Sequence, residues 1–241
     1  MCVSVDGGFL DTVRAQVLDD QLRPLHELDL EGVPSRVRLS PDGRLVAVTV
    51  FVAGHSYGSP GFSTSTTIWD TRSGERVGEL EGFRFALDGK QVDAVDRNFW
   101  GVTFARDGRT FYATMATGGR TYLVEGDLGT RRGLVLAEGV ECPSLSPDET
   151  RVAFKQRRPG RAVTWTLAVL DLASRDRTVL PVGAEVDDQP YWLDDETVAY
   201  GVPRGSTGED ASRQDTWAVP ADGSGRPRLL REDAWSLVLE D

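Results

Sequence analysis

The chain has 241 residues, of which 39% are hydrophobic, and carries a formal net charge of −11. This length is enough for a sizeable core, and all-β chains of this size form one domain, so we expect a single domain over residues 1–241. The acidic charge opposes phosphate backbones and argues against nucleic acid as the main partner. No apolar run in the sequence is long enough to predict a membrane span.

Two segments with alternating apolar and polar residues open the chain. Residues 9–19 and 23–29 alternate in this way, which predicts two β-strands. They are typical of the outer strands of a four-stranded sheet. We therefore expect the inner strand of that sheet, with its turn, to precede Met1.

A turn followed by an alternating strand occurs four times. The copies are Leu39–Val48, Phe104–Ala113, Leu145–Phe154 and Trp192–Tyr200, and their turn aspartates are Asp42, Asp107, Asp148 and Asp195. Proline and aspartate favour the turn because proline presets one backbone angle and aspartate accepts bonds from its own backbone. The copies recur after roughly 40 to 65 residues, which is the range of four-stranded propeller blades when the first carries insertions.

Four complete blades follow from this spacing. Their strands are expected at 35–40, 44–53, 67–70 and 76–80; at 99–105, 109–116, 121–127 and 133–137; at 144–146, 151–156, 163–172 and 178–181; and at 190–193, 197–202, 216–219 and 228–230. Residues 234–239 form one further strand, which we expect to enter the blade begun by the N-terminus and so hide its edges. The predicted fold class is all-β, a β-propeller of four-stranded antiparallel blades, with four complete blades plus a terminal blade shared by the N- and C-termini.

The repeats also resemble a known family. The segments Leu39–Val50 and Ile68–Gly74, with the strand end Leu170-Asp171-Leu172, resemble the PD40 or WD-like repeats of TolB-like bacterial propeller proteins. Residues 98–104, 116–121 and 140–147 resemble an actinobacterial TolB-like group, and the resemblance covers nearly the whole chain. It implies derivation from a six-bladed, non-enzymatic cell-envelope protein that is exported or membrane-anchored.

The sequence departs from that family at its start. We expect the chain to lack the opening blade and the N-terminal anchor, and nothing in it matches the separate α/β domain that TolB carries. The partners of TolB are therefore not transferred to this chain.

One segment fits a nucleophile motif. Gly54-His55-Ser56-Tyr57-Gly58 has the G-x-S-x-G pattern and follows a strong strand. The motif requires a helix after the serine, and the following Ser59-Pro60-Gly61 disfavours one. No histidine follows His55, so the sequence predicts a loop here and no catalytic residues.

No metal or cofactor is expected. The two histidines, His26 and His55, cannot form a plausible zinc site, and the cysteines Cys2 and Cys142 lack zinc or redox spacing. Asp187-Asp188 and Asp194-Asp195 offer oxygens for calcium, but we expect a loop and a turn there. A second set of aspartates, which ends the third strands, is expected to bond the turns that follow: Asp70, Asp127 and Asp171.

The long connecting segments are expected on one rim. In up-and-down blades, the second-to-third-strand loops and the blade-to-blade connections share a rim, and residues 54–66, 81–97 and 203–213 all fall there. Long loops cost conformational entropy, so their gathering on one rim suggests use in binding. The candidate binding residues are His55, Tyr57, Phe62, Phe83, Phe85, Asp88, Asp93, Asp187 and Asp188, with Trp100 and Trp192 on inner strands that border a propeller channel.

The predicted function is that of a non-catalytic binding or scaffold protein of the cell envelope. A protein or peptide partner is expected, because apolar and acidic side chains are mixed on the candidate rim. The alternative is an enzyme-associated propeller, either the gating domain of a peptidase or a lyase that acts in the channel. The lyase would need a cluster of tyrosine, histidine or arginine side chains in the channel.

Overall fold

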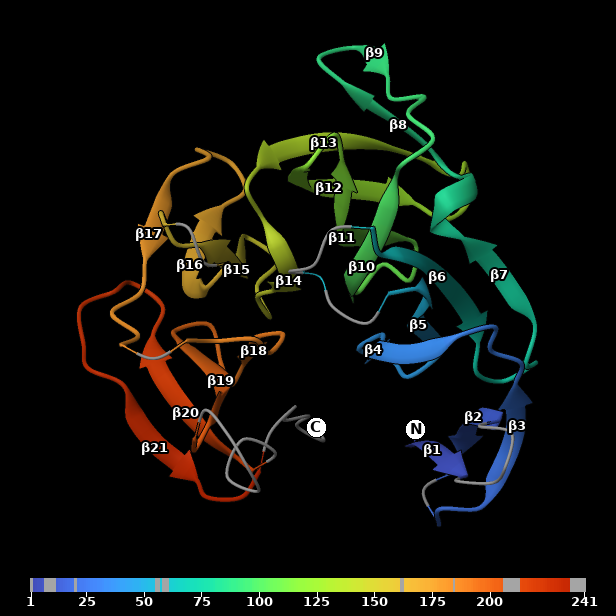
Figure 1. The fold of residues 1–241 in the computed structure, drawn as a ribbon, viewed down its shortest axis with the longest axis horizontal. Coiled ribbons are helices and arrows are strands. Elements are labelled where there is room, and N and C mark those ends of the chain that lie inside the picture. The colour runs from blue at the N-terminus through green and yellow to red at the C-terminus, as the bar shows by residue number, and fades with distance from the viewer. Residues whose placement is uncertain are drawn as a thin grey trace. The chain divides into compact units, whose positions relative to one another are not determined.

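The computed structural model describes residues 2–6, 12–19, 21–54, 57, 61–160, 163–183, 185–205 and 213–234. Within them, the only helical element is the 3-10 turn η1 (Leu80–Gly82), so the described chain is all-β (Figure 1). The strands are β1 (Cys2–Asp6), β2 (Thr12–Leu18), β3 (Pro24–Leu28), β4 (Val33–Leu39), β5 (Leu45–Ala53), β6 (Ser63–Asp70), β7 (Arg76–Glu79), β8 (Arg84–Leu87), β9 (Lys90–Gln91), β10 (Asn98–Phe104), β11 (Thr110–Thr117), β12 (Arg120–Asp127), β13 (Arg132–Glu138), β14 (Glu141–Leu145), β15 (Arg151–Arg157), β16 (Trp165–Asp171), β17 (Arg177–Val179), β18 (Tyr191–Trp192), β19 (Thr197–Pro203), β20 (Gln214–Pro220) and β21 (Arg228–Arg231).

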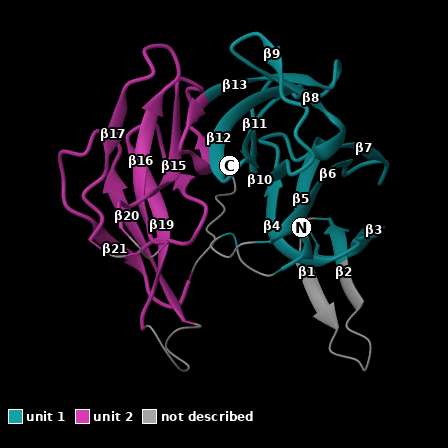
Figure 2. Cartoon of the chain, turned by 45° about the horizontal axis from the view of Figure 1, so that its top comes forward, with its two compact units in different colours: residues 1–136 teal, residues 137–241 magenta. Residues whose placement is uncertain are grey.

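The chain divides into two compact units, residues 1–136 and 137–241 (Figure 2). The first unit contains the sheets β1-β2-β3 and β4-β5-β6-β7 and most of a six-stranded sheet ordered β10-β11-β12-β13-β8-β9, while the second contains β14-β15-β16-β17 and β18-β19-β20-β21. Four sheets thus each hold four strands in chain order, which is the arrangement of a propeller blade. The predicted fold class is confirmed, and a single domain over residues 1–241 stays a prediction.

The repeated aspartates close the short turns. Asp42, Asp107 and Asp148 each accept a hydrogen bond from the backbone N–H two residues further on, at 3.1, 2.8 and 3.1 Å. In the fourth copy Asp194 has this role and not Asp195, since the Glu196 N–H donates to Asp194 at 2.9 Å. That turn is one residue shorter than the turn after β14, so the aspartate is displaced by one position.

The aspartates at the ends of the third strands behave as expected. Asp70 accepts from the backbone N–H groups of Arg72 and Ser73 at 2.9 and 3.0 Å, and Asp171 does the same for Ala173 and Ser174 at 2.9 and 2.8 Å. Asp127 accepts from the Thr130 N–H at 2.6 Å. These carboxylates are structural, because they hold the third-to-fourth-strand turns.

Inner strands are buried on both faces. In β5, alternate residues enter two different cores: Leu45 and Ala47 pack with Ile68, and Val46, Val48 and Val50 pack with Leu28. In the second unit, Ala153 and Leu167 pack with Val198 in the core between the sheets of β14 and β18. Side chains that point into these faces are therefore removed from solvent, whether they are apolar or charged.

One expectation about the start of the chain is wrong. β1 (Cys2–Asp6) pairs antiparallel with β2, from Cys2 opposite Gln16 to Asp6 opposite Thr12, so an inner neighbour of β2 follows Met1 rather than preceding it. The shared terminal blade stays a prediction, because residues 7–11 and 235–241 lie outside the described part.

The segment 81–97 also differs from the expected loop. It contains η1 and the hairpin of β8 and β9, and β8 pairs in parallel with β13, the outer strand of its blade. Gly133 permits this pairing, because a Cβ there would lie 2.5 Å from the ring of Phe85. Asp88 and Gly89 form the two-residue turn with φ of 48° and 76°, which the Asp-Gly pair favours.

Candidate functional site

The long segments of the first unit meet at one end of β6. The Thr64 N–H donates to Oδ1 of Asn98 at 2.8 Å, and the Thr66 N–H lies 3.1 and 3.0 Å from the two carboxylate oxygens of Glu81. The described parts of residues 54–66 and 81–97 therefore share a rim, as the sequence predicted, whereas residues 206–212 of the third long segment lie outside the described residues. One end of each blade carries the loop between its second and third strands and the connection to the next blade. We call this end the connection rim.

The aromatic candidates on this rim form a packed cluster. The rings of Tyr57 and Trp100 stack with centroids 4.6 Å apart, and Phe62 meets both edge-on. Tyr57 and Trp100 are buried, and the Tyr57 hydroxyl bonds with that of Ser35. Trp100, a candidate because its inner strand was expected to border a channel, is fully buried in this cluster and offers no exposed surface.

Two other aromatic candidates belong to the core. Phe83 and Phe85 are buried with Leu80, Phe99 and Phe111, so they offer no contact surface, contrary to the sequence interpretation. Their burial follows from η1 and β8, which place this segment against the sheet rather than in a loop.

Two acidic candidates lie on the appended hairpin and beyond it. Asp88 is exposed in the turn of that hairpin, and exposed Asp93 accepts a hydrogen bond from the Gln91 amide. The remaining candidate of this unit, His55, lies outside the described residues, as does Ser56 of the G-x-S-x-G motif.

The partly buried carboxyl group of Glu81 contacts both sides of this rim. Glu81 accepts the Thr66 N–H, and the guanidinium of Arg97 donates to the backbone oxygens of Glu81 and Phe83 at 3.1 and 3.0 Å. Burial raises the pKa of Glu81 to about 8, against the opposing effect of the Thr66 N–H. The neighbouring Glu79 also raises this pKa.

In the second unit, the connection rim carries charges that are buried. The Lys155 side chain is 0% exposed, its ammonium bonds Oδ1 of Asp187, and it lies 4.1 Å from the ring centroid of Trp165. Glu141 is fully buried as well, and its Oε1 accepts from Nε of Arg157 at 2.6 Å. Its other oxygen, Oε2, is buried and has no hydrogen-bond partner among the residues that the structure describes, which is costly for an ionised carboxylate.

The blades place these groups at one repeated position. In β10, Trp100 is opposite Thr114 just before a β-bulge, and in β14, Glu141 is opposite Lys155 just before a bulge of the same form. The pairs Leu145–Val152 and Trp192–Val198 stand at the ends of β14 and β18. Asp188 precedes Trp192 by the same number of residues as Glu141 precedes Leu145, so Asp188 is the matching residue of the fourth blade. We call this place in each blade the bulge position. All three residues are buried, whereas the matching residue of the first blade, Ser35, is half-buried.

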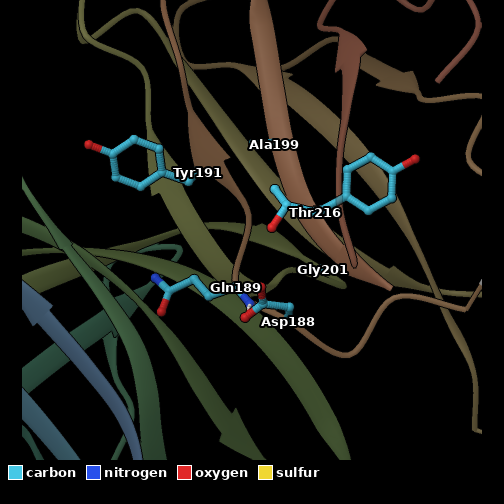
Figure 3. Close-up of a pocket in the computed structure, with 7 residues that line it drawn as sticks. Asp188, Gln189, Tyr191, Ala199, Gly201 and Thr216 are labelled. Atoms are coloured by element: carbon cyan, nitrogen blue, oxygen red, sulfur yellow. Dashed lines mark hydrogen bonds between the residues drawn. The ribbon is translucent and has the colours of Figure 1, made fainter. Parts of the chain in front are cut away.

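The fourth blade has a recess beside its bulge position. Asp188, Gln189, Tyr191, Ala199, Tyr200, Gly201 and Thr216 line it (Figure 3). Asp188 is buried and accepts the Gln189 N–H at 2.8 Å, and the Gln189 amide donates to the Pro143 oxygen at 2.7 Å. Burial raises the pKa of Tyr200 to about 12, so its phenol stays protonated at neutral pH.

Two sequence candidates, Asp187 and Asp188, are therefore part of one polar site in the second unit. Trp192 is not: it is buried in the core, and its Nε1 donates to the Ser144 oxygen at 2.8 Å. Sequence reasoning missed Glu141, Lys155 and Gly201. Aligning the blades by strand pairs rather than by turn aspartates would have shown that acids replace an aromatic residue at the bulge position.

The chemistry available at this site is ionic binding. Carboxylates, an ammonium group and amide groups lie together, and within the described residues no group of three or more His, Cys, Asp or Glu side chains is placed to hold a metal ion. The part of the chain that the structure describes also has no helix long and apolar enough to cross a membrane.

Similar proteins agree with the fold. No protein-family model matches the chain, and no curated protein matches it. Among solved structures, TolB from Acinetobacter baumannii has a TM-score of 0.57 at 18% identity over 88% of this chain, and a putative TolB from Agrobacterium tumefaciens has a TM-score of 0.55 at 15% identity over 86%. A puromycin-hydrolyzing peptidase of Mycobacterium tuberculosis has a TM-score of 0.53 at 17% identity over 92%. This chain spans 46%, 69% and 32% of those three proteins, and at such identities the likeness shows the propeller fold alone.

Proposed function

We propose that this chain is a non-catalytic propeller binding module that holds a protein or peptide segment at the connection rim of its second unit. The observation that carries the proposal is the burial of Lys155 and Glu141 at a position where the second blade has Thr114 and Trp100. The fold accepts uncharged side chains there, so it does not require the charges. Buried charges cost free energy, and their use in recognition accounts for them.

The remaining parts of the proposal rest on the resemblance to TolB-like proteins. We place the protein outside the cytoplasm, in the cell envelope, and assign it a scaffold role rather than catalysis. The alternative, a propeller that serves an attached peptidase, has support from the fold likeness to the puromycin-hydrolyzing peptidase. The two differ in whether the reading frame of this chain also encodes a peptidase domain; a serine-directed fluorophosphonate probe does not separate them, because neither propeller supplies the nucleophile.

A display selection tests the binding function. Peptides enriched on the wild-type protein are measured for affinity to Asp187→Asn/Asp188→Asn and to Asp222→Asn. Asp222 is a matched control, because it is an exposed aspartate in the β20–β21 turn at the opposite end of its blade. We expect the double variant to bind roughly tenfold or more weakly, as loss of hydrogen bonds to charged groups implies.

Two results would contradict this function. One is that no peptide is enriched above background on the folded protein. The other is that the enriched peptides bind the rim variant and the Asp222 variant equally well, because the connection rim would then not be their site.

A further inference from the structure

Two arginines lie side by side where the β8–β9 hairpin joins the second blade. β8 pairs in parallel with the outer strand β13, and Arg84 is in register with Arg132 (Figure 1). Phe85 is buried and faces Gly133, so the alternation of side chains places both arginines on the opposite face of the sheet, where both are exposed. Adjacent strands lie about 4.8 Å apart, and like charges directly opposite each other are destabilising.

Neither positive charge is offset within the part of the chain that the structure describes. No hydrogen bond or ion pair joins either guanidinium group to a described residue. The acids on the adjoining segments are paired with other arginines, Glu79 with Arg76 and Asp127 with Arg109. The repulsion between the two arginines is therefore not relieved by the described residues around them.

The other blades show that the fold does not require an arginine at residue 132. In the first three complete blades, the backbone oxygen of the aspartate that ends the third strand accepts the N–H of the residue four positions further on. These donor and acceptor pairs are Gly74 and Asp70, Arg131 and Asp127, and Arg175 and Asp171. The residue after the donor is an exposed acid in the first and third blades, Glu75 and Asp176, but it is Arg132 in the second. An acid there would stand opposite Arg84 and remove the repulsion, so the arginine does not serve stability.

We propose that Arg84 and Arg132 bind an acidic segment of a protein partner, whose carboxylates accept hydrogen bonds from both guanidinium groups. Arginine and carboxylate match in planar, two-point contacts. The chain itself contains such a contact, in which two nitrogens of Arg109 donate to the two carboxylate oxygens of Asp127. The inference goes beyond the proposed function, because this site lies in the first unit and not at the connection rim of the second.

The same face favours a protein segment over a small inorganic anion. Leu134 is in register with Ala86 and stands two residues from Arg132, so it lies on the face of the two arginines. It is 55% exposed and offers apolar contact to a residue between the acids of the segment. The net charge of −11 disfavours an acidic ligand at places without such a pair of cations, which makes this site selective.

An NMR titration of the whole chain with short capped peptides tests the site. The probes are the N-acetyl amides of the tripeptides Asp-Leu-Asp and Asn-Leu-Asn, with inorganic phosphate as a third probe, all at one ionic strength. We expect saturable binding of Asp-Leu-Asp, with shifts at the amides of residues 84–86 and 132–134, and no saturable binding of Asn-Leu-Asn. Phosphate should bind roughly tenfold more weakly than Asp-Leu-Asp, because it gains no apolar contact with Leu134.

The variant Arg132→Glu places the acid of the first and third blades in the second. It should weaken binding of Asp-Leu-Asp roughly tenfold or more, and its thermal midpoint should be at or above that of the wild type, because an ion pair with Arg84 replaces the repulsion. Arg84→Gln should also weaken binding, without adding a new charge. The matched control is Arg228→Glu, since Arg228 is an exposed arginine on the outer strand β21 and the net charge changes equally. This control should leave binding nearly unchanged.

Several results overturn the inference: no saturable binding of Asp-Leu-Asp, equal binding of Asn-Leu-Asn or phosphate, or equal weakening in Arg132→Glu and Arg228→Glu. A thermal midpoint of Arg132→Glu clearly below that of the wild type also contradicts it, because the fold would then need the arginine. The proposed function is tested separately, since Asp187→Asn/Asp188→Asn should leave binding of Asp-Leu-Asp unchanged.

Discussion

Replacing Lys155 by methionine tests whether the buried charges are there for stability. Methionine keeps an unbranched side chain but removes the ammonium that bonds Asp187 and lies 4.1 Å from the ring centroid of Trp165. We expect the free energy of unfolding of Lys155→Met to stay within about 1 kcal/mol of the wild type, because the change removes a buried ammonium group whereas its partner Asp187 is largely exposed and stays hydrated.

The structure sets the size of the effect. Lys155 is 0% exposed, so its ammonium has lost its hydration, whereas the Asp187 side chain is 56% exposed and stays hydrated without it. Glu141 keeps its bond from Arg157 when the lysine is gone. The matching residue of the second blade, Thr114, is equally buried and uncharged, so the sheet tolerates a neutral side chain there.

The reciprocal change should cost more. Asp187→Ala leaves the buried ammonium without its carboxylate, and we expect a loss of about 1–3 kcal/mol, below the value for a fully buried pair because Asp187 is half exposed. Urea unfolding followed by circular dichroism and by tryptophan fluorescence measures both variants, with Asp222→Asn as the control. A loss above about 3 kcal/mol in Lys155→Met would refute the reasoning, because the pair would then be a structural requirement.

The remaining predictions concern pH, turns and packing. Because the folded pKa of Glu81 is raised to about 8 from its ordinary 4.5, protonated Glu81 stabilises the fold fully below the ordinary value, and this contribution is lost as pH rises towards 8. The thermal midpoint should fall over that window, and Glu81→Gln should flatten its slope; an unchanged slope would show that the carboxyl is hydrated. Asp107→Ala removes the acceptor for the Arg109 and Thr110 N–H groups and should cost about 1 kcal/mol in urea unfolding, whereas Asp93→Ala should cost almost nothing. Gly126→Ala would place a Cβ 2.2 Å from the Phe111 ring and should cost about 1–3 kcal/mol, against little change in Gly129→Ala, where the nearest atom is 3.5 Å away; equal costs would contradict this packing.

The blades were predictable from the sequence because their signals are local. A turn aspartate such as Asp42 or Asp107 bonds the backbone two residues away, and strand alternation follows from the same few positions. The β8–β9 hairpin also has a local signal in its Asp88-Gly89 turn, but its parallel pairing with β13 was not predictable, because that pairing depends on Gly133, which is distant in the chain. Phe83 and Phe85 were misassigned for the same reason: apolar residues in a segment read as a loop belong to the core once that segment pairs with a sheet.

The candidate site was predictable only in part. Asp187 and Asp188 attract notice as adjacent acids, but their environment depends on Glu141 and Lys155, which are isolated charges in apolar strands and carry no motif. Single charged residues in a strand pattern usually indicate its solvent face. Here both faces of the strand are covered, so the alternation rule points the wrong way, and only the cross-strand pairing shows that these charges are buried.

The bulge position also explains why similarity of fold leaves the ligand open. The backbone there is a bulge between the first two strands of a blade, with Gly101 at φ 62° in β10 and Cys142 at φ 49° in β14, and it buries the preceding side chain each time. The fold fixes where that side chain goes, and the residue type decides what it can bind: Trp100 stacks on Tyr57, whereas Glu141 takes an arginine. The residues at the bulge position are therefore where substitutions in this protein should be made first.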